Sequence, residues 1–304
     1  MPCIHSLPCF PHECCAEWSD EVKELLQVAS QLPYIGFYDV FSGQGRMAQE
    51  AAQFGWPAAS FDRDADPVRQ DCLSTEGRRR FILDCLCMRP LSLAVLGPPC
   101  KFAIWMTRSL HGKSRTNPLG NGSAFAEEGN RLADFCANAL RLIAWRRCIY
   151  MLECPLSSVM PEFPALNQAL QDTGAVRLFM CQGWAGASSL KPTVLWTNAP
   201  YAAPMLALFR LKPFEANICR ALASRGRWVT GNRFMLQSAA YPVEFCHMVL
   251  RSHDNWVSGL KKEFRLVLLL AVWPLLRLWI YPGGCRMLEG LGEVELQIYS
   301  LLMV

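Results

Sequence analysis

The stretch YDVFSGQGRMAQEAAQFG, residues 38–55, carries the signal that decides the fold. Ile35–Phe41 is predicted as a buried strand and Met47–Phe54 as a helix, so Gly43 and Gly45 fall in the turn between them. Glycine permits unusual backbone angles, lets a ligand approach the chain closely and leaves amide hydrogens pointing at it. The stretch therefore predicts a nucleotide-like cofactor bound at a strand-to-helix turn.

Short apolar segments alternate with helical ones on both sides of this turn. Further strands are predicted at Ala58–Asp62, Phe81–Leu83, Leu93–Leu96 and Ile149–Glu153, and helices at Trp18–Leu32 and Asn130–Trp145. Val176–Gln182 and Thr193–Thr197 are predicted as an antiparallel strand pair. The pattern predicts an α/β fold with a doubly wound, Rossmann-like sheet that is mostly parallel and has the antiparallel pair at its end.

Composition narrows the class of protein. The 304 residues are 52% hydrophobic and 18% charged, which indicates a globular chain, and the net charge of +4 neither supports nor excludes a nucleic-acid partner. The 15 cysteines are an odd number in a long chain, unlike a disulfide scaffold, and those near the N-terminus follow no metal-ligand spacing. With no signal-peptide pattern, we expect a location inside the cell, in the nucleus or the cytoplasm, and no bound metal.

Four segments are expected along the chain. They are a tail and entry helix at 1–32, a cofactor-binding domain at 33–200, an extension of it at 201–253 and an apolar segment at 254–304. Residues 266–281, LVLLLAVWPLLRLWIY, are shorter than the roughly 18 to 20 residues that span a bilayer. We expect them to form a buried or partner-facing helix, with membrane contact as the alternative.

Three acidic residues are predicted at strand tips near the turn. Asp62 lies 19 residues beyond Gly43, where a carboxylate accepts the ribose hydroxyls of a cofactor, and Asp84 is placed to accept from an adenine amino group. Asp39 would repel a pyrophosphate but suits a cation such as S-adenosylmethionine. Gly43, Gly45 and Ala48 also satisfy the dinucleotide pattern, so a nicotinamide or flavin enzyme stays an alternative.

Cys100 follows two prolines in LAVLGPPCKFAIW, residues 93–105. In open α/β sheets, ligands bind beyond the carboxyl ends of strands where the strand order reverses, and the strand before Gly97 flanks that point. A thiol there is placed beside the predicted cofactor, whereas a cysteine elsewhere in the chain is expected to be a small buried side chain.

The motifs DVFSGQG, FDRD, FILD and GPPC occur in the order and close to the spacing of DNA cytosine-5 methyltransferases, and the resemblance covers roughly residues 34–200. The resemblance implies S-adenosylmethionine as the cofactor, nucleic acid as the substrate, DNA more than RNA, and Cys100 as the nucleophile. Glu153, in YMLECP, would hold the flipped base. The cofactor-binding residues that it implies, together with the acids above, are Asp39, Phe41, Ser42, Gly43, Gly45, Asp62, Asp84, Gly97 and Pro98.

A loop rich in Gly, Asn, Ser and Pro follows Cys100, from Met106 to Ser123. Its basic side chains predict a mobile loop that closes over a phosphate backbone, with a plain solvated loop as the alternative. The predicted nucleic-acid contacts are Lys101, Arg108, Lys113, Arg115 and, on the later strand pair, Lys191. Two other functions stay open: a catalytically silent binding module of the same fold, and an NAD-dependent oxidoreductase.

Overall fold

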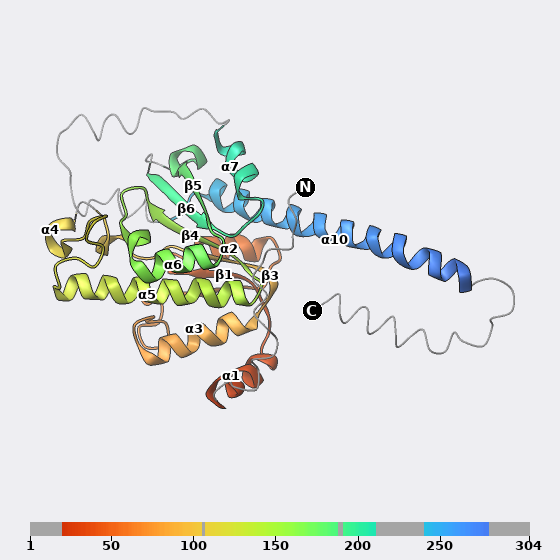
Figure 1. Cartoon of the computed structure of the whole chain (residues 1–304), viewed down its shortest axis with the longest axis horizontal. Helices are drawn as coiled ribbons and strands as arrows, with labels where there is room; N and C mark the ends of the chain where they lie inside the picture. Colours follow the sequence, from red (N-terminus) through yellow and green to blue (C-terminus); the bar gives the residue numbers. More distant parts are fainter. Residues whose placement is uncertain (1–19, 105–106, 188–190, 211–239, 280–304) are drawn as a thin grey trace. The chain divides into compact units, whose positions relative to one another are not determined.

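The computed structural model describes residues 20–104, 107–187, 191–210 and 240–279 (Figure 1). The chain divides into two compact units, Met1–Ser252 and His253–Val304. The cysteine-rich stretch before Asp20 lies outside the described residues.

Within these ranges, six strands of the first unit form one mixed sheet in the order β2-β1-β3-β4-β6-β5. The strands are β1 (Ile35–Val40), β2 (Ala58–Phe61), β3 (Met88–Leu96), β4 (Ile149–Pro155), β5 (Val176–Cys181) and β6 (Pro192–Thr197). β2, β1, β3 and β4 pair in parallel, whereas β6 runs antiparallel to both β4 and β5. The predicted α/β class and the antiparallel pair at the end of the sheet are confirmed.

The chain reverses its direction of travel across the sheet after β2, because β3 pairs with β1 on the side away from β2. Right-handed crossovers then put α2 on one face of the sheet and α3, α5 and α6 on the other. The helices of this unit are α1 (Asp20–Ser30), α2 (Arg46–Gln53), α3 (Thr75–Cys87), α4 (Arg108–His111), α5 (Ala124–Trp145), α6 (Pro164–Asp172) and α7 (Ala202–Arg210). Figure 1 shows α3 and α5 stacked side by side below the sheet.

The strand predicted at Phe81–Leu83 is wrong, because these residues lie in α3. The Ser74 hydroxyl caps the start of this helix by accepting from the amide of Gly77 at 2.9 Å. Asp84 and Cys85 follow Phe81 by about one helical turn, so all three side chains face the core. Because the buried residue Asp84 is polar, the apolar residues of this segment do not show a clear helical period.

The core of the unit lies between the sheet and α3, α5 and α6. Phe61, Phe81 and Phe135 meet there, with the rings of Phe81 and Phe135 4.7 Å apart. Phe41, directly after β1, adds an edge-on contact to Phe135. This aromatic group supports the ends of β1 and β2 from beneath, where the glycine turn leaves the sheet.

α10 runs from Val243 to Trp279, so it begins in the first unit and continues into the second. The apolar run at 266–281 falls on it as far as Trp279, and its side chains lie outside the described residues, as do residues 280 and 281. No helix in the part of the chain that the structure describes is long and apolar enough to cross a membrane.

Candidate active site

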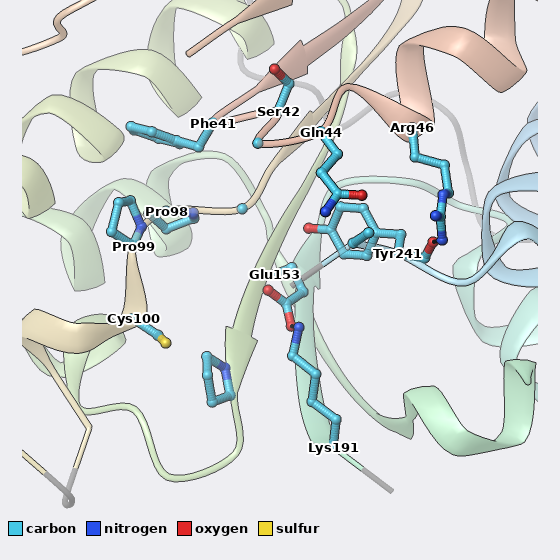
Figure 2. Close-up of a pocket in the computed structure, with 14 residues that line it drawn as sticks. Phe41, Ser42, Gln44, Arg46, Pro98, Pro99, Cys100, Glu153, Lys191 and Tyr241 are labelled. Carbon is cyan, nitrogen blue, oxygen red and sulfur yellow. Dashed lines mark hydrogen bonds and ion pairs between the residues drawn. The ribbon is translucent and has the colours of Figure 1, made fainter. Parts of the chain in front are cut away.

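A cavity of about 180 Å³ opens at the carboxyl ends of β1, β3 and β4, where the strand order reverses (Figure 2). It brings together many of the residues singled out in the sequence: Phe41, Ser42, Gly43, Gly97, Pro98, Cys100, Glu153 and Lys191. It also takes in residues that the sequence did not single out, namely Gln44, Arg46, Pro99, Pro155, Ala240 and Tyr241. A second, more open hollow of about 420 Å³ lies on the other side of the turn, against α2 and β2, and includes Gly45.

The glycine turn has the backbone that its sequence predicts. Gly43 and Gly45 have φ angles of 53° and 66°, in the left-handed region that glycine tolerates. A side chain added at Gly43 would meet nothing within 4 Å, so the backbone there faces open space. Asp62, directly after β2, accepts from the amide of Gly43 at 2.8 Å. Asp62 thus braces the turn but does not itself line the cavity.

Asp39 lies beneath the turn, 2% exposed, and accepts from the amide of Ala48 in the first turn of α2 at 3.2 Å. Burial and, to a smaller extent, the charge of Asp62 raise the pKa of Asp39 to about 7, against the opposing effect of the hydrogen bond from Ala48. The carboxyl therefore changes charge near neutral pH and would favour a cation bound next to it. Asp39 does not line the cavity directly.

Cys100 begins a short 3-10 helix, Cys100–Phe102, directly after the two prolines that end β3. It is partly exposed, whereas the other cysteines in the described ranges are buried. Burial and the carboxylate of Glu153 raise the pKa of the Cys100 thiol, while the ammonium of Lys191 lowers it. The thiol is protonated at rest, so the charge around it governs how readily it becomes a nucleophile.

Glu153 lies near the end of β4, 6% exposed, and its carboxylate lines the same cavity as Cys100. Its Oε1 atom accepts from the Gln182 amide at 3.2 Å and from the Thr193 hydroxyl at 3.3 Å. The ammonium of Lys191 lies 3.9 Å from the same oxygen. The sequence did not single out Gln182 or Thr193, because both reach Glu153 only through the pairing of β4, β5 and β6.

Tyr241 enters the cavity from a segment nearly two hundred residues after the glycine turn. Its hydroxyl lies where a side chain on Gly97 would go, 2.7 Å from the position of the missing Cβ. Its carbonyl accepts from the guanidinium of Arg46 at 2.9 Å. Burial, with the charges of Glu153 and Asp39, raises the pKa of Tyr241 well above its usual value. Figure 2 shows its ring between the glycine turn and Glu153.

Asp84 is not at a strand tip, contrary to the prediction. It lies on α3, 4% exposed, and its carboxylate accepts from the Tyr38 hydroxyl at 2.9 Å and from Arg80 at 3.0 Å. Asp84 is hydrogen-bonded to these partners and does not line the cavity, so we do not propose it as a cofactor-binding residue.

The basic loop after Cys100 contains the short helix α4 and local hydrogen bonds. His111, at the end of α4, is fully buried; its Nε2–H donates to the carbonyl of Ile104 at 3.0 Å, and its Nδ1 accepts from the amide of Lys113 at 2.8 Å. Lys113 is 5% exposed, so it does not lie on the surface, and its predicted contact with nucleic acid stays a prediction. Lys101, Arg108 and Arg115 are exposed, and their contact with nucleic acid stays a prediction.

Comparisons with known proteins give only partial structural matches at low sequence identity. No family model matches the sequence, and no curated protein matches it significantly. The Dnmt2 methyltransferase of S. pombe is 12% identical with a TM-score of 0.34, over 54% of this chain and 49% of that one. The Entamoeba histolytica methyltransferase EhMeth is 13% identical with a TM-score of 0.35, over 56% and 55%. The chain thus matches about half the length of these structures.

Proposed function

We propose that this chain is an S-adenosylmethionine-dependent methyltransferase that acts on carbon 5 of cytosine in nucleic acid. The observation that carries the proposal is the cavity itself, since it holds a thiol and a carboxylate from the ends of two neighbouring strands beside a glycine turn. Cytosine-5 chemistry needs both groups, because carbon 5 becomes nucleophilic only after a thiolate adds to carbon 6.

The residues at the turn suit the cofactor. The open backbone at Gly43 offers room for close approach, Phe41 and Pro98 supply apolar surface, and Asp39 beneath the turn favours a positive charge. Asp39 also disfavours a pyrophosphate, which weighs against the nicotinamide alternative. S-adenosylmethionine, when bound, supplies a methyl group activated by a positively charged sulfur.

Cys100 and Glu153 are expected to act on different atoms of the target base. The Cys100 thiol gives its proton to solvent and its sulfur forms a bond to carbon 6, while a protonated Glu153 carboxyl donates a hydrogen bond to ring nitrogen N3, beside the amino group. The hydrogen bond to N3 draws electrons away from carbon 6 and so favours the addition. The electron pair moves to carbon 5, which takes up the methyl group. Loss of the carbon 5 proton to a base then expels the thiolate and leaves 5-methylcytosine. The target base must leave its stack to reach this cavity.

The raised pKa of Cys100 favours a second candidate function, a binding module that keeps the cavity but transfers no methyl group. One experiment separates the two. DNA and RNA fragments of mixed sequence, made with 5-fluorocytosine at every cytosine, are incubated with the protein and S-adenosylmethionine. Fluorine at carbon 5 cannot leave as a proton does, so an active enzyme stays bonded to the base through Cys100.

The expected result is a covalent adduct on denaturing gels with DNA, RNA or both. It should be absent from Cys100→Ser and present in Cys87→Ser, a matched change at a buried cysteine at the end of α3. Failure of the folded wild-type protein to form any adduct, while calorimetry shows that S-adenosylmethionine binds, would support the binding module and overturn the methyltransferase.

A further inference from the structure

Glu153 is held by one of its two carboxylate oxygens. The Gln182 amide, the Thr193 hydroxyl and the Lys191 ammonium all lie at Oε1, at 3.2, 3.3 and 3.9 Å. No described residue donates to Oε2. Figure 2 shows one carboxylate oxygen at the tip of Lys191 and the other facing the open space in front of Cys100.

The antiparallel strands bring these donors together. Thr193 pairs with Pro155 on β4, which places the start of β6 beside the end of β4. Gln182 follows β5 directly, and its backbone N–H donates to the carbonyl of Lys191 at 3.3 Å, so the ladder between the two strands extends one step past Cys181 and Pro192. Its side-chain amide, Nε2, is the group that donates to Glu153. Gln182 therefore reaches Glu153 from the end of β5, across the intervening strand β6, at the base of the connection rather than at its tip.

The fold gains little from a glutamine at this place. Gln182 is 1% exposed, and its own Oε1 has no hydrogen-bond partner among the described residues. A buried acceptor without a partner destabilises the folded chain, and an apolar side chain of similar size would avoid that cost. The contact that accounts for a glutamine here is the hydrogen bond that its amide donates to Glu153.

We propose that Gln182 is a positioning residue for Glu153, and this inference rests on the proposed function. Its amide fixes the rotation of the carboxylate so that Oε2 faces the cavity, where the ring edge of the base is read. It does so without a charge, so it adds no positive potential that would compete with the base for the carboxylate. Gln182 is not expected to touch the base or the cofactor, since it does not line the cavity.

The test follows the rate of adduct formation on fluorinated nucleic acid from pH 5 to pH 8, each variant being compared with wild type at the same pH. Gln182→Leu keeps the size but removes the donor, and its rate should fall about 10- to 100-fold at every pH, because a displacement of about 1 Å is enough for such a loss. The affinity for S-adenosylmethionine, measured by calorimetry, should stay within about twofold of wild type.

Gln182→Glu supplies a signature that a purely structural role would not produce. The new carboxyl can donate to Glu153 only while it is protonated, and two carboxyls that share a site have a raised pKa. Its rate relative to wild type should therefore be closest to normal near pH 5 and should fall as the pH rises through about 6 to 7. Gln168→Leu is the matched control, since Gln168 donates to the carboxylate of Asp172 at 2.7 Å on an exposed face of α6. It should leave the rate unchanged.

The outcomes separate this inference from the proposed function. An adduct with wild type but an undiminished rate in Gln182→Leu would overturn the positioning role alone. If Gln182→Leu does not fold, a flat relative pH profile in Gln182→Glu would overturn it as well. No adduct with wild type removes the methyl-transfer function, and the role of Gln182 in it falls at the same time.

Discussion

Substitution of Gly97 by alanine tests whether Tyr241 closes the cavity. The added Cβ would lie 2.7 Å from the Tyr241 hydroxyl oxygen, where an ordinary contact begins near 3.4 Å, so the hydroxyl must move by about 0.7 Å. The ring has little freedom to move, because it packs against Phe245 at 5.2 Å and its carbonyl is held by Arg46. Such overpacking costs about 1–3 kcal/mol.

Tyr241→Phe should relieve this strain. Without the hydroxyl, the nearest atom of the ring to the new Cβ is Cζ at 3.6 Å, which is an ordinary contact. No described residue forms a hydrogen bond with that hydroxyl, so Tyr241→Phe alone should stay near wild-type stability. The double variant should then recover most of the loss, which gives a coupling free energy of about 1–3 kcal/mol.

The assay is thermal unfolding of the full chain for wild type, both single variants and the double variant. At this size, 1 kcal/mol corresponds to a shift in Tm of about 2–4 °C. Gly36→Ala is the control, since its Cβ meets its nearest neighbour, Pro57, at 3.4 Å and is far from Tyr241 in sequence. If Gly97→Ala costs the same with Phe at position 241 as with Tyr, Tyr241 does not occupy the cavity as described.

Three further outcomes are expected. Because the pKa of Asp39 is raised to about 7, the folded carboxyl keeps a proton that the unfolded chain releases above about pH 4. The free energy of unfolding should therefore fall as the pH rises from about 4 to 7, and urea titrations of Asp39→Asn should lose that slope. Iodoacetamide should alkylate Cys100 faster in Glu153→Gln and slower in Lys191→Met, as followed by peptide mass spectrometry, because Glu153 raises and Lys191 lowers the pKa of that thiol. Asp84→Leu should cost about 1–3 kcal/mol in urea unfolding by depriving a buried phenol of its acceptor, yet calorimetry should show unchanged binding of S-adenosylmethionine.

The local signals in the sequence were sufficient for most of the sheet. Strand-to-helix alternation and the spacing of Gly43 and Gly45 depend on neighbours a few residues apart, so they can be read without the fold. The same holds for Cys100, whose place after a strand tip follows from the break at Gly97. The strand predicted at Phe81–Leu83 was wrong. The sequence did contain a helix signal there, because Ser74 is a typical N-cap residue at the start of α3.

The remaining parts of the cavity depend on contacts that no local pattern encodes. Tyr241 approaches Gly97 across 144 positions of sequence, and Gln182 reaches Glu153 across 29. Lys113 stands in a polar, basic stretch, but it is buried, and its backbone N–H donates to the fully buried His111 two positions earlier. In each case the deciding fact is which distant surface the side chain meets, and only the folded chain supplies it.

The reversed direction of β6 also indicates where the protein can accept added sequence. A hairpin joins β5 to β6, and the hydrogen bond from the backbone N–H of Gln182 to the Lys191 carbonyl closes it at the base. Residues inserted after Ala187, past the 3-10 helix Gln182–Ala185, lengthen the connection, and the entropic cost of a longer loop grows slowly. That position is therefore a suitable attachment point for a fluorescent reporter or a sequence-reading domain.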